Sequence, residues 1–215
     1  MNRTAVVFDL DGTLIDSVPD IRNAANAAVA GMGIDLFSVA EIRSFVGAGA
    51  PILIERMLAA RDKPQSLKDE IYPRFLDAYK DAHNATVLYP HVRETLTALR
   101  DAGYALGICT NKPDIPTRAV LDHFDLTSMF EVIIGGDTFP KRKPDPMPLF
   151  AAYDPLEAAQ RIYVGDSEVD ADTAVAANVP FLLYTEGYRK TPVAEMPHTV
   201  AFDDYRLLPE IIAGL

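Results

Sequence analysis

Short apolar runs recur along the chain and alternate with stretches of helical periodicity. The apolar runs predict strands, which are Thr4–Phe8, Ala105–Thr110, Glu131–Ile134, Arg161–Gly165, Phe181–Tyr184 and a weaker one at Thr199–Phe202. Most are continuously apolar, as strands are when both faces of a parallel sheet are covered. Helical patterns lie between them, at Val92–Arg100, Ile115–Phe124 and Glu168–Asn178. The alternation predicts an α/β fold, with a Rossmann-like doubly wound parallel sheet.

One connection departs from this alternation, because no strand is expected between Ser17 and about Ala105. The helix signals in this stretch are Ser17 as an N-cap, the capping box Ser38-Val39-Ala40-Glu41, Pro51 at a helix start and Ser66 opening a helix to about Lys80. Ordinary crossover loops are far shorter than this segment. We therefore expect an all-helical cap domain at residues 17–85, inserted after the first strand. Residues 1–16 and 86–215 would form the α/β catalytic core.

The charge and cysteine content exclude several functional classes. The net charge is −11 over 215 residues, with a pI near 4.7, so there is no general basic face for nucleic acid or an anionic membrane. Cys109 is the single cysteine, which excludes an internal disulfide and favours a reducing compartment. No long apolar segment or signal-peptide core is present, so we expect a cytoplasmic protein. The sequence does not distinguish a monomer from a homodimer.

Polar side chains gather where the predicted strands end. Strand one runs into Asp9-Leu10-Asp11-Gly12-Thr13, the next into Thr110-Asn111-Lys112, and a later one into Gly165-Asp166-Ser167. A basic turn, Lys141-Arg142-Lys143-Pro144-Asp145-Pro146, precedes that later strand. In an open parallel sheet, ligands bind beyond the carboxyl ends of the strands. Acids, a hydroxyl and a lysine at one edge are the groups that phosphoryl transfer through a carboxylate nucleophile requires.

Four segments in order resemble the motifs of the haloacid dehalogenase superfamily: "DLDGTLIDS", "TNK", "KPDP" and "GDSEVDAD". Three more, "VGAGAPILIER", "VLYPHVRETL" and "FLLYTEGYRK", resemble its phosphoglycolate phosphatase branch. The resemblance implies that Asp9 is the nucleophile, and that Asp11 protonates the leaving oxygen and then activates water. It also implies a Mg²⁺ ion on Asp9, Asp166 and the main-chain carbonyl of Asp11.

The same resemblance assigns the remaining site residues. Gly12, Thr110, Asn111 and Lys143 would bind the phosphoryl group, and only the family pattern selects Lys143 over Lys141. Asp170 would hold a metal-bound water or brace Lys143. Simpler structural roles remain open at this stage: Thr110 could cap a helix, and Ser167 with Asp170 could form a capping box. We expect "TEGYRK" to be a surface loop, with the alternative that it lines the entrance to the site.

Three functions fit these residues. The first is a Mg²⁺-dependent phosphatase that acts on a small phosphate ester, which we expect to be 2-phosphoglycolate. The second is a sugar phosphomutase of the beta-phosphoglucomutase type, and the third is a non-catalytic phosphate-binding regulator. Gly47 and Gly49, ahead of a helix N-terminus at Pro51, could bring backbone N–H groups to the substrate carboxylate. The sequence does not show whether Arg43 or Arg56 faces the same cleft.

Overall fold

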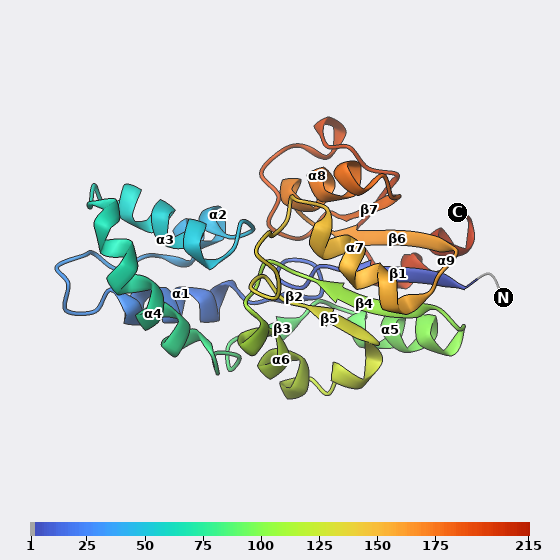
Figure 1. The fold of residues 1–215 in the computed structure, drawn as a ribbon, viewed down its shortest axis with the longest axis horizontal. Coiled ribbons are helices and arrows are strands. Elements are labelled where there is room, and N and C mark those ends of the chain that lie inside the picture. The colour runs from blue at the N-terminus through green and yellow to red at the C-terminus, as the bar shows by residue number, and fades with distance from the viewer. Residues whose placement is uncertain (1–2) are drawn as a thin grey trace.

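The computed structural model describes residues 3–215, and a parallel sheet forms the centre of the larger of two units (Figure 1). The strand order is β5-β4-β1-β6-β7-β8, and every neighbouring pair is parallel. The strands are β1 (Thr4–Phe8), β4 (Ala105–Cys109), β5 (Val132–Ile134), β6 (Gln160–Gly165), β7 (Phe181–Tyr184) and β8 (Val200–Phe202). All six predicted strands are confirmed.

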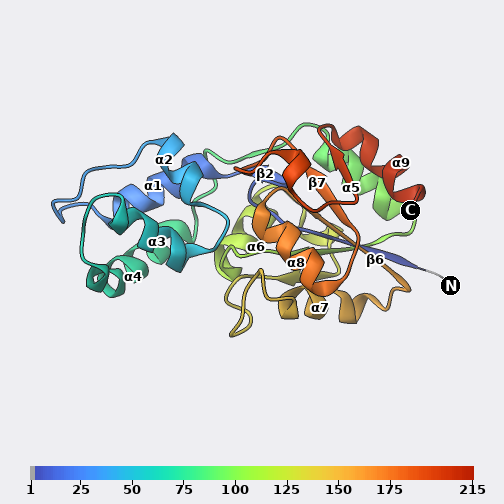
Figure 2. The same ribbon diagram turned by 90° about the horizontal axis from the view of Figure 1, so that it is seen from above.

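Helices cover both faces of this sheet (Figure 2). One face packs against α5 (Val92–Asp101), α6 (Asp114–His123) and α9 (Leu208–Ala213), and the other against α7 (Met147–Tyr153) and α8 (Glu168–Ala177). Successive side chains of a strand point to opposite faces, so Val6 and Phe8 join the first core, and Ala5 and Val7 join the second. The α/β class is confirmed, whereas the short helices α7 and α9 were not predicted.

The register of β1 brings three polar segments to one edge of the sheet. Phe8 pairs with Ile108 of β4 on one side and with Val164 of β6 on the other. The three strands therefore end level with one another, and the residues that follow them share the carboxyl edge. Asp9 leaves the central strand between its two neighbours.

A second, all-helical unit lies beyond that edge (Figure 1). It contains α1 (Val18–Ala28), α2 (Val39–Phe45), α3 (Ala50–Ala59) and α4 (Lys68–Tyr79), which share a hydrophobic core of their own. The predicted Ser38–Glu41 capping box is present, and Pro51 lies in the first turn of α3. The start expected at Ser66 is wrong, because a 3-10 turn precedes α4. Among the described helices, none is both long and apolar enough to cross a membrane.

A short antiparallel pair joins the two units and corrects the sequence prediction. β2 (Ile15–Asp16) pairs with β3 (Val87–Leu88), so a strand does occur between Ser17 and Ala105. The side chain of Ser17 does not cap α1 as expected, since its hydroxyl donates to Asp11 instead. The β2–β3 pair lies next to the two points where the chain passes between the core and the helical unit. We therefore propose residues 17–85 as the extent of the cap domain.

Candidate active site

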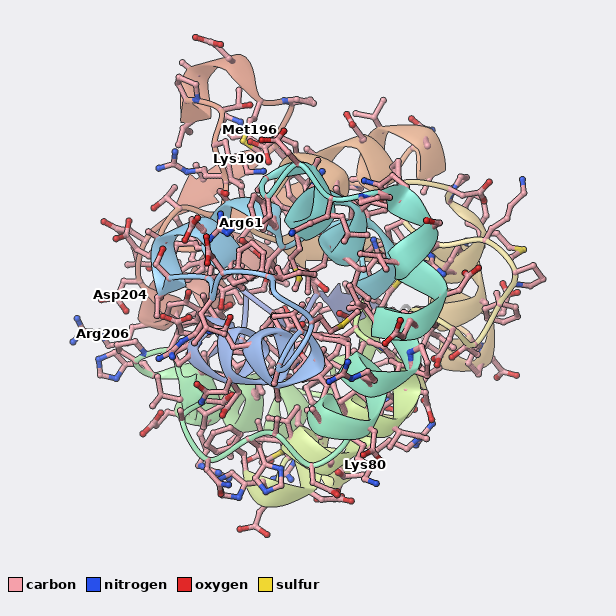
Figure 3. The ribbon with its side chains drawn as sticks, turned by 90° about the vertical axis from the view of Figure 1, so that its left-hand side faces the viewer. Arg61, Lys80, Lys190, Met196, Asp204 and Arg206 are labelled. Carbon is pink, nitrogen blue, oxygen red and sulfur yellow. The ribbon has the colours of Figure 1, made fainter. Side chains whose placement is uncertain are left out.

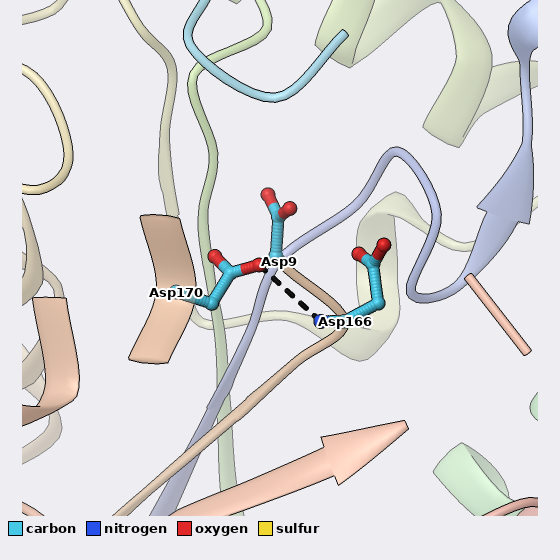
Figure 4. Close-up of side chains that lie close together, drawn as sticks. All are labelled: Asp9, Asp166 and Asp170. Atoms are coloured by element: carbon cyan, nitrogen blue, oxygen red, sulfur yellow. Dashed lines mark hydrogen bonds between the residues drawn. The ribbon is translucent and has the colours of Figure 1, made fainter. Parts of the chain in front are cut away.

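Three carboxylates converge at the carboxyl edge of the sheet (Figure 4). Asp9 follows β1, Asp166 follows β6, and Asp170 projects from the first turn of α8. Each is buried, and one carboxylate oxygen from each lies within 4.8 Å of those of the other two. Buried carboxylates repel each other because they carry the same charge, so a nearby cation is needed to stabilise this arrangement.

Lys143 supplies one positive charge to this cluster. Its Nζ lies 2.6 Å from Asp170 Oδ1 and 2.9 Å from Asp9 Oδ1, and it donates to the Tyr163 hydroxyl at 2.8 Å. By contrast, the ammonium of Lys141 is exposed and pairs with Asp145. The structure therefore places Lys143, and not Lys141, beside the proposed nucleophile.

Asp170 is fully engaged by its neighbours within the protein. Its Oδ2 accepts hydrogen bonds from the Ser167 hydroxyl at 2.6 Å and from the amides of Asp166 and Ser167, while its Oδ1 accepts from Tyr163 at 2.8 Å. The Ser167–Asp170 capping box is also present. The capping role and the ionic role therefore coexist, and the contacts favour bracing of Lys143 over direct metal binding.

Burial and charge shift the pKa values of the cluster in different directions. Burial raises the pKa of Asp9 to about 6, with Lys143 opposing the rise and Asp170 adding to it. Burial, with the charges of Asp170 and Asp9, raises the pKa of Asp166 well above its ordinary value. Burial alone would raise the pKa of Asp170, but its contact with Lys143 holds that pKa below its ordinary value. Lys143 therefore compensates mainly the charge of Asp170, and binding of a further cation beside Asp9 and Asp166 would be favourable.

Asp11 lies at the junction between core and cap. Its Oδ1 accepts hydrogen bonds from the Ser17 hydroxyl at 2.6 Å and from Lys112 Nζ at 3.0 Å. Lys112 also donates to the hydroxyl of Tyr79, a residue of cap helix α4. Sequence reasoning assigned no role to Lys112, although it completes the "TNK" segment. The available signal was its position two residues after Thr110, the end of the predicted strand.

Thr110 and Asn111 follow β4 and have different surroundings. The Thr110 hydroxyl accepts from the Lys112 amide at 3.2 Å and does not cap α6, whose N-cap is Pro113. The Asn111 side-chain amide donates to the carbonyls of Lys143 and Gly47, and its oxygen accepts from the Lys143 amide. In this structure the Asn111 side chain thus fixes the Lys143 backbone and the cap loop, and it has no N–H left for a phosphoryl oxygen.

Gly12 has a steric role beside Asp166. With φ of +91°, it lies so close that a Cβ there would stand 2.4 Å from Asp166 Oδ2. That same Oδ2 accepts from the Tyr188 amide at 2.6 Å, and Oδ1 accepts from the Thr13 hydroxyl at 2.7 Å. A side chain at position 12 would displace Asp166 from this frame.

Tyr188 corrects the expectation that "TEGYRK" is a surface loop. Its side chain is buried in the hydrophobic core of the cap, although the residue follows β7 of the sheet. Its hydroxyl donates to Asp16 Oδ1 at 2.8 Å and accepts from the Ser17 amide at 2.9 Å. Since its amide also donates to Asp166, Tyr188 links the proposed metal ligand to the connection between core and cap.

A pocket lies between the cap and the edge of the sheet. Its lining includes Asp9, Asp11, Thr110, Asn111 and Lys112 from the core, together with Gly47, Gly49, Ala50, Leu53, Phe75 and Tyr79 from the cap. Figure 3 views the molecule from this end, with the cap helices in front of the sheet. Both glycines singled out in the sequence thus face the same pocket as the proposed nucleophile.

Two arginines of the cap, Arg43 and Arg56, lie elsewhere. Arg43 pairs with Asp16 at 3.0 Å and covers the ring of Tyr188. Arg56 donates to the carbonyl of Phe45 and lines a second cavity with Asp166, Glu168 and Lys190, which adjoins the first at Asp11 and Gly47. Neither arginine lines the pocket that contains Asp9.

The carboxylate oxygens of Asp9 and Asp166 are suitable ligands for a divalent cation. Asp9 Oδ1 is buried without a hydrogen-bond donor, since its contact with Lys143 is ionic and lacks the angles of a hydrogen bond. Carboxylate oxygens of this kind are ligands that Mg²⁺ prefers. A divalent cation there would offset the burial and the mutual repulsion that raise the pKa values of Asp9 and Asp166.

Comparison with known proteins agrees with this fold. The family described as haloacid dehalogenase-like hydrolase matches residues 6–184. A phosphoglycolate phosphatase of Cereibacter sphaeroides is 46% identical over 213 residues, 98% of each chain. One of Rhodobacter capsulatus is 43% identical over 212 residues, 98% of this chain and 97% of its own. The crystal structure of a predicted phosphoglycolate phosphatase from Haemophilus somnus aligns with a TM-score of 0.91, 29% identity and 99% coverage of both chains. This chain therefore belongs to the haloacid dehalogenase-like hydrolase family.

Proposed function

We propose that this phosphoric monoester hydrolase is a Mg²⁺-dependent phosphatase that hydrolyses 2-phosphoglycolate through an aspartyl phosphate. The observation that carries the proposal is the buried Asp9, which pairs with Lys143 and lines one pocket with Asp11 beneath the cap. The names of relatives at 46% and 43% identity support the substrate.

In the first step, an Asp9 carboxylate oxygen attacks phosphorus, and the bond from phosphorus to the ester oxygen breaks. Asp11 gives a proton to the departing glycolate oxygen, which would otherwise leave as a poorly stabilised alkoxide. The ammonium of Lys143 and the hydroxyl of Thr110 offset the negative charge on the equatorial phosphoryl oxygens. The products of this step are glycolate and phosphorylated Asp9.

In the second step, water attacks the phosphorus of the aspartyl phosphate. Asp11, now ionised, takes a proton from that water, and the bond from phosphorus to Asp9 breaks. Phosphate leaves, and both carboxyl groups return to their starting states. The cap shields the pocket during the first step and must admit water for the second.

Mg²⁺ would be held by Asp9, Asp166 and the main-chain carbonyl of Asp11, where it neutralises charge on the cluster and the phosphoryl group. The raised pKa of Asp9, about 6, makes this binding pH-dependent. At about pH 5 most of the metal-free protein carries a proton on Asp9 that the metal must displace, and at about pH 7.5 it does not.

We expect saturating MgCl₂ to raise the melting temperature by about 5–10 °C at about pH 7.5 and by clearly less at about pH 5. Thermal melts at both pH values, with and without chelator, measure the effect. Asp166→Asn should reduce the shift at the higher pH, because one proposed ligand loses its charge. Equal shifts at both pH values would contradict the assignment of Asp9.

The pocket favours a small acid over a sugar as the leaving group. On its cap side the side chains of Ile21, Val46, Leu53 and Phe75 are apolar, and the hydroxyl of Tyr79 is already engaged by Lys112. An apolar pocket discriminates only weakly between substrates that fit its shape. It binds a hydroxyl group tightly only where it can form a hydrogen bond to that group. The backbone at Gly47 and Gly49 and the N-terminus of α3 border the same pocket, where they could approach a carboxylate.

A panel of phosphorylated metabolites tests the proposed function. We expect phosphate release with 2-phosphoglycolate to have the highest kcat/KM, by about 10-fold or more over sugar phosphates. The same mixtures, with a sugar bisphosphate primer, should yield little sugar phosphate isomer. Isomer formation faster than phosphate release would favour the phosphomutase instead. Binding without turnover of any ester would favour a regulatory protein.

We also propose a cytoplasmic location, which the single buried Cys109 supports. Burial raises the pKa of this thiol to about 12, so it is unsuited to act as a nucleophile.

A further inference from the structure

Lys112 is an unusual residue for the floor of a substrate pocket. Its side chain is 1% exposed, and its ammonium contacts Asp11 at 3.0 Å on the core side. On the cap side it donates to the Tyr79 hydroxyl and lies 4.3 Å from the centre of that ring. A lysine ammonium has three N–H donors, so these two hydrogen bonds leave one donor for a ligand.

The pocket contains no other side chain that could balance an anion. Among the described residues that line it, Lys112 is the only lysine or arginine, and Asp9 and Asp11 are both acidic. A carboxylate brought into this space would lose its water and face two acids. Arg43 pairs with Asp16, and Arg56 donates to the Phe45 carbonyl and lines the adjoining cavity, so neither lines this pocket. Lys112 is thus the side chain placed to offset such a charge.

Its position also suits the chemistry of the proposed substrate. If Asp11 protonates the ester oxygen, that oxygen must come within hydrogen-bond reach of Asp11. The Lys112 ammonium is a direct neighbour of the same carboxylate. In 2-phosphoglycolate a single methylene separates the ester oxygen from the substrate carboxylate. The carboxylate therefore falls beside Lys112 when the ester oxygen lies beside Asp11.

We propose that Lys112 is the specificity-determining residue that binds the substrate carboxylate, an assignment that rests on the proposed phosphatase function. The ammonium donates its remaining hydrogen to that carboxylate. Tyr79 holds the ammonium from helix α4 of the cap, so the complete carboxylate site forms only when the cap lies over the core. A carboxylate-free ester offers this remaining N–H no substrate carboxylate to bind.

A matched pair of non-hydrolysable ligands tests this assignment by binding alone. 3-Phosphonopropionate has the length and charge of 2-phosphoglycolate, and propylphosphonate replaces the carboxylate with a methyl group. With Mg²⁺ present, calorimetry should give the wild type a Kd lower by about 10- to 100-fold for 3-phosphonopropionate, as expected for a charge-assisted hydrogen bond. Lys112→Met should abolish this preference and leave the Kd of propylphosphonate within about threefold.

Two further variants separate a local effect from a general one. Lys190→Met removes a lysine from the neighbouring cavity and should keep the wild-type preference. Lys112→Gln retains a donor toward Asp11 and Tyr79 without the charge, and should also lose the preference if Lys112→Met proves poorly folded. A wild type that binds both ligands equally, or a Lys112→Gln that keeps the full preference, overturns the proposal.

Turnover distinguishes carboxylate binding from mere positioning of Asp11. Lys112→Met should lower kcat/KM for 2-phosphoglycolate about 10- to 100-fold more than for ethyl phosphate, mainly through KM. Equal losses on both esters would mean that Lys112 acts through Asp11, and the assignment would fail. Absence of wild-type turnover on any ester, with the binding preference intact, would remove the proposed function and support the carboxylate site.

Discussion

Asp9→Asn should lower kcat for 2-phosphoglycolate by about 10⁴-fold or more, because an amide oxygen is a far weaker nucleophile than a carboxylate. Asp170 is not placed to replace it, since its carboxylate is engaged by Lys143, Tyr163 and Ser167. Steady-state phosphate release measures the loss. Quenched samples of the wild type should also contain phosphorylated protein, which the variant should lack.

The fold should survive this change. Because the pKa of Asp9 is raised to about 6, the ionised carboxylate that predominates near neutral pH destabilises the metal-free folded protein relative to the unfolded chain. A neutral side chain of the same shape should therefore melt at a temperature no lower than that of the wild type without metal. Retention of more than a few per cent of activity would assign the nucleophile to another residue.

Lys143→Met should both inactivate and destabilise the protein. The change leaves three carboxylates buried within 4.8 Å of one another without their cation. Breaking a buried ion pair by removing one partner costs about 3–5 kcal/mol of unfolding free energy. For a chain of this size, that is a loss of about 10 °C in melting temperature, measured without Mg²⁺.

Lys141→Met is the matched control, since it removes a lysine two positions away in the same turn. Its pair with Asp145 is exposed on the lysine side, so its loss should cost less than about 1 kcal/mol and leave kcat unchanged. If both variants melted alike, the Lys143 contacts would contribute nothing particular to stability. If Lys143→Met kept wild-type turnover, its assigned contact with the phosphoryl group would be wrong.

Elements whose signals are local could be predicted from the amino-acid sequence alone. Apolar runs marked the six strands, and Ser38–Glu41 and Ser167–Asp170 are capping boxes within one helical turn. Strand-end acids at Asp9, Asp11 and Asp166 indicated the site, because carboxyl ends of neighbouring parallel strands meet at one edge. The order of four motifs indicated the family. Each of these signals depends on a few adjacent residues.

Contacts between side chains that are far apart in the chain depend on the tertiary fold and could not be predicted in this way. Nothing near Tyr188 in the sequence shows that it joins Asp166 to Asp16 and Ser17, or that Lys112 lies between Asp11 and Tyr79. The β2–β3 pair escaped prediction because two-residue strands carry no readable periodicity. Whether a charged side chain lies in solvent or in a pocket depends on the packing of the cap over the core. Lys112 lines the pocket that contains Asp9, whereas Arg43 contacts Asp16 and Arg56 contacts the Phe45 carbonyl.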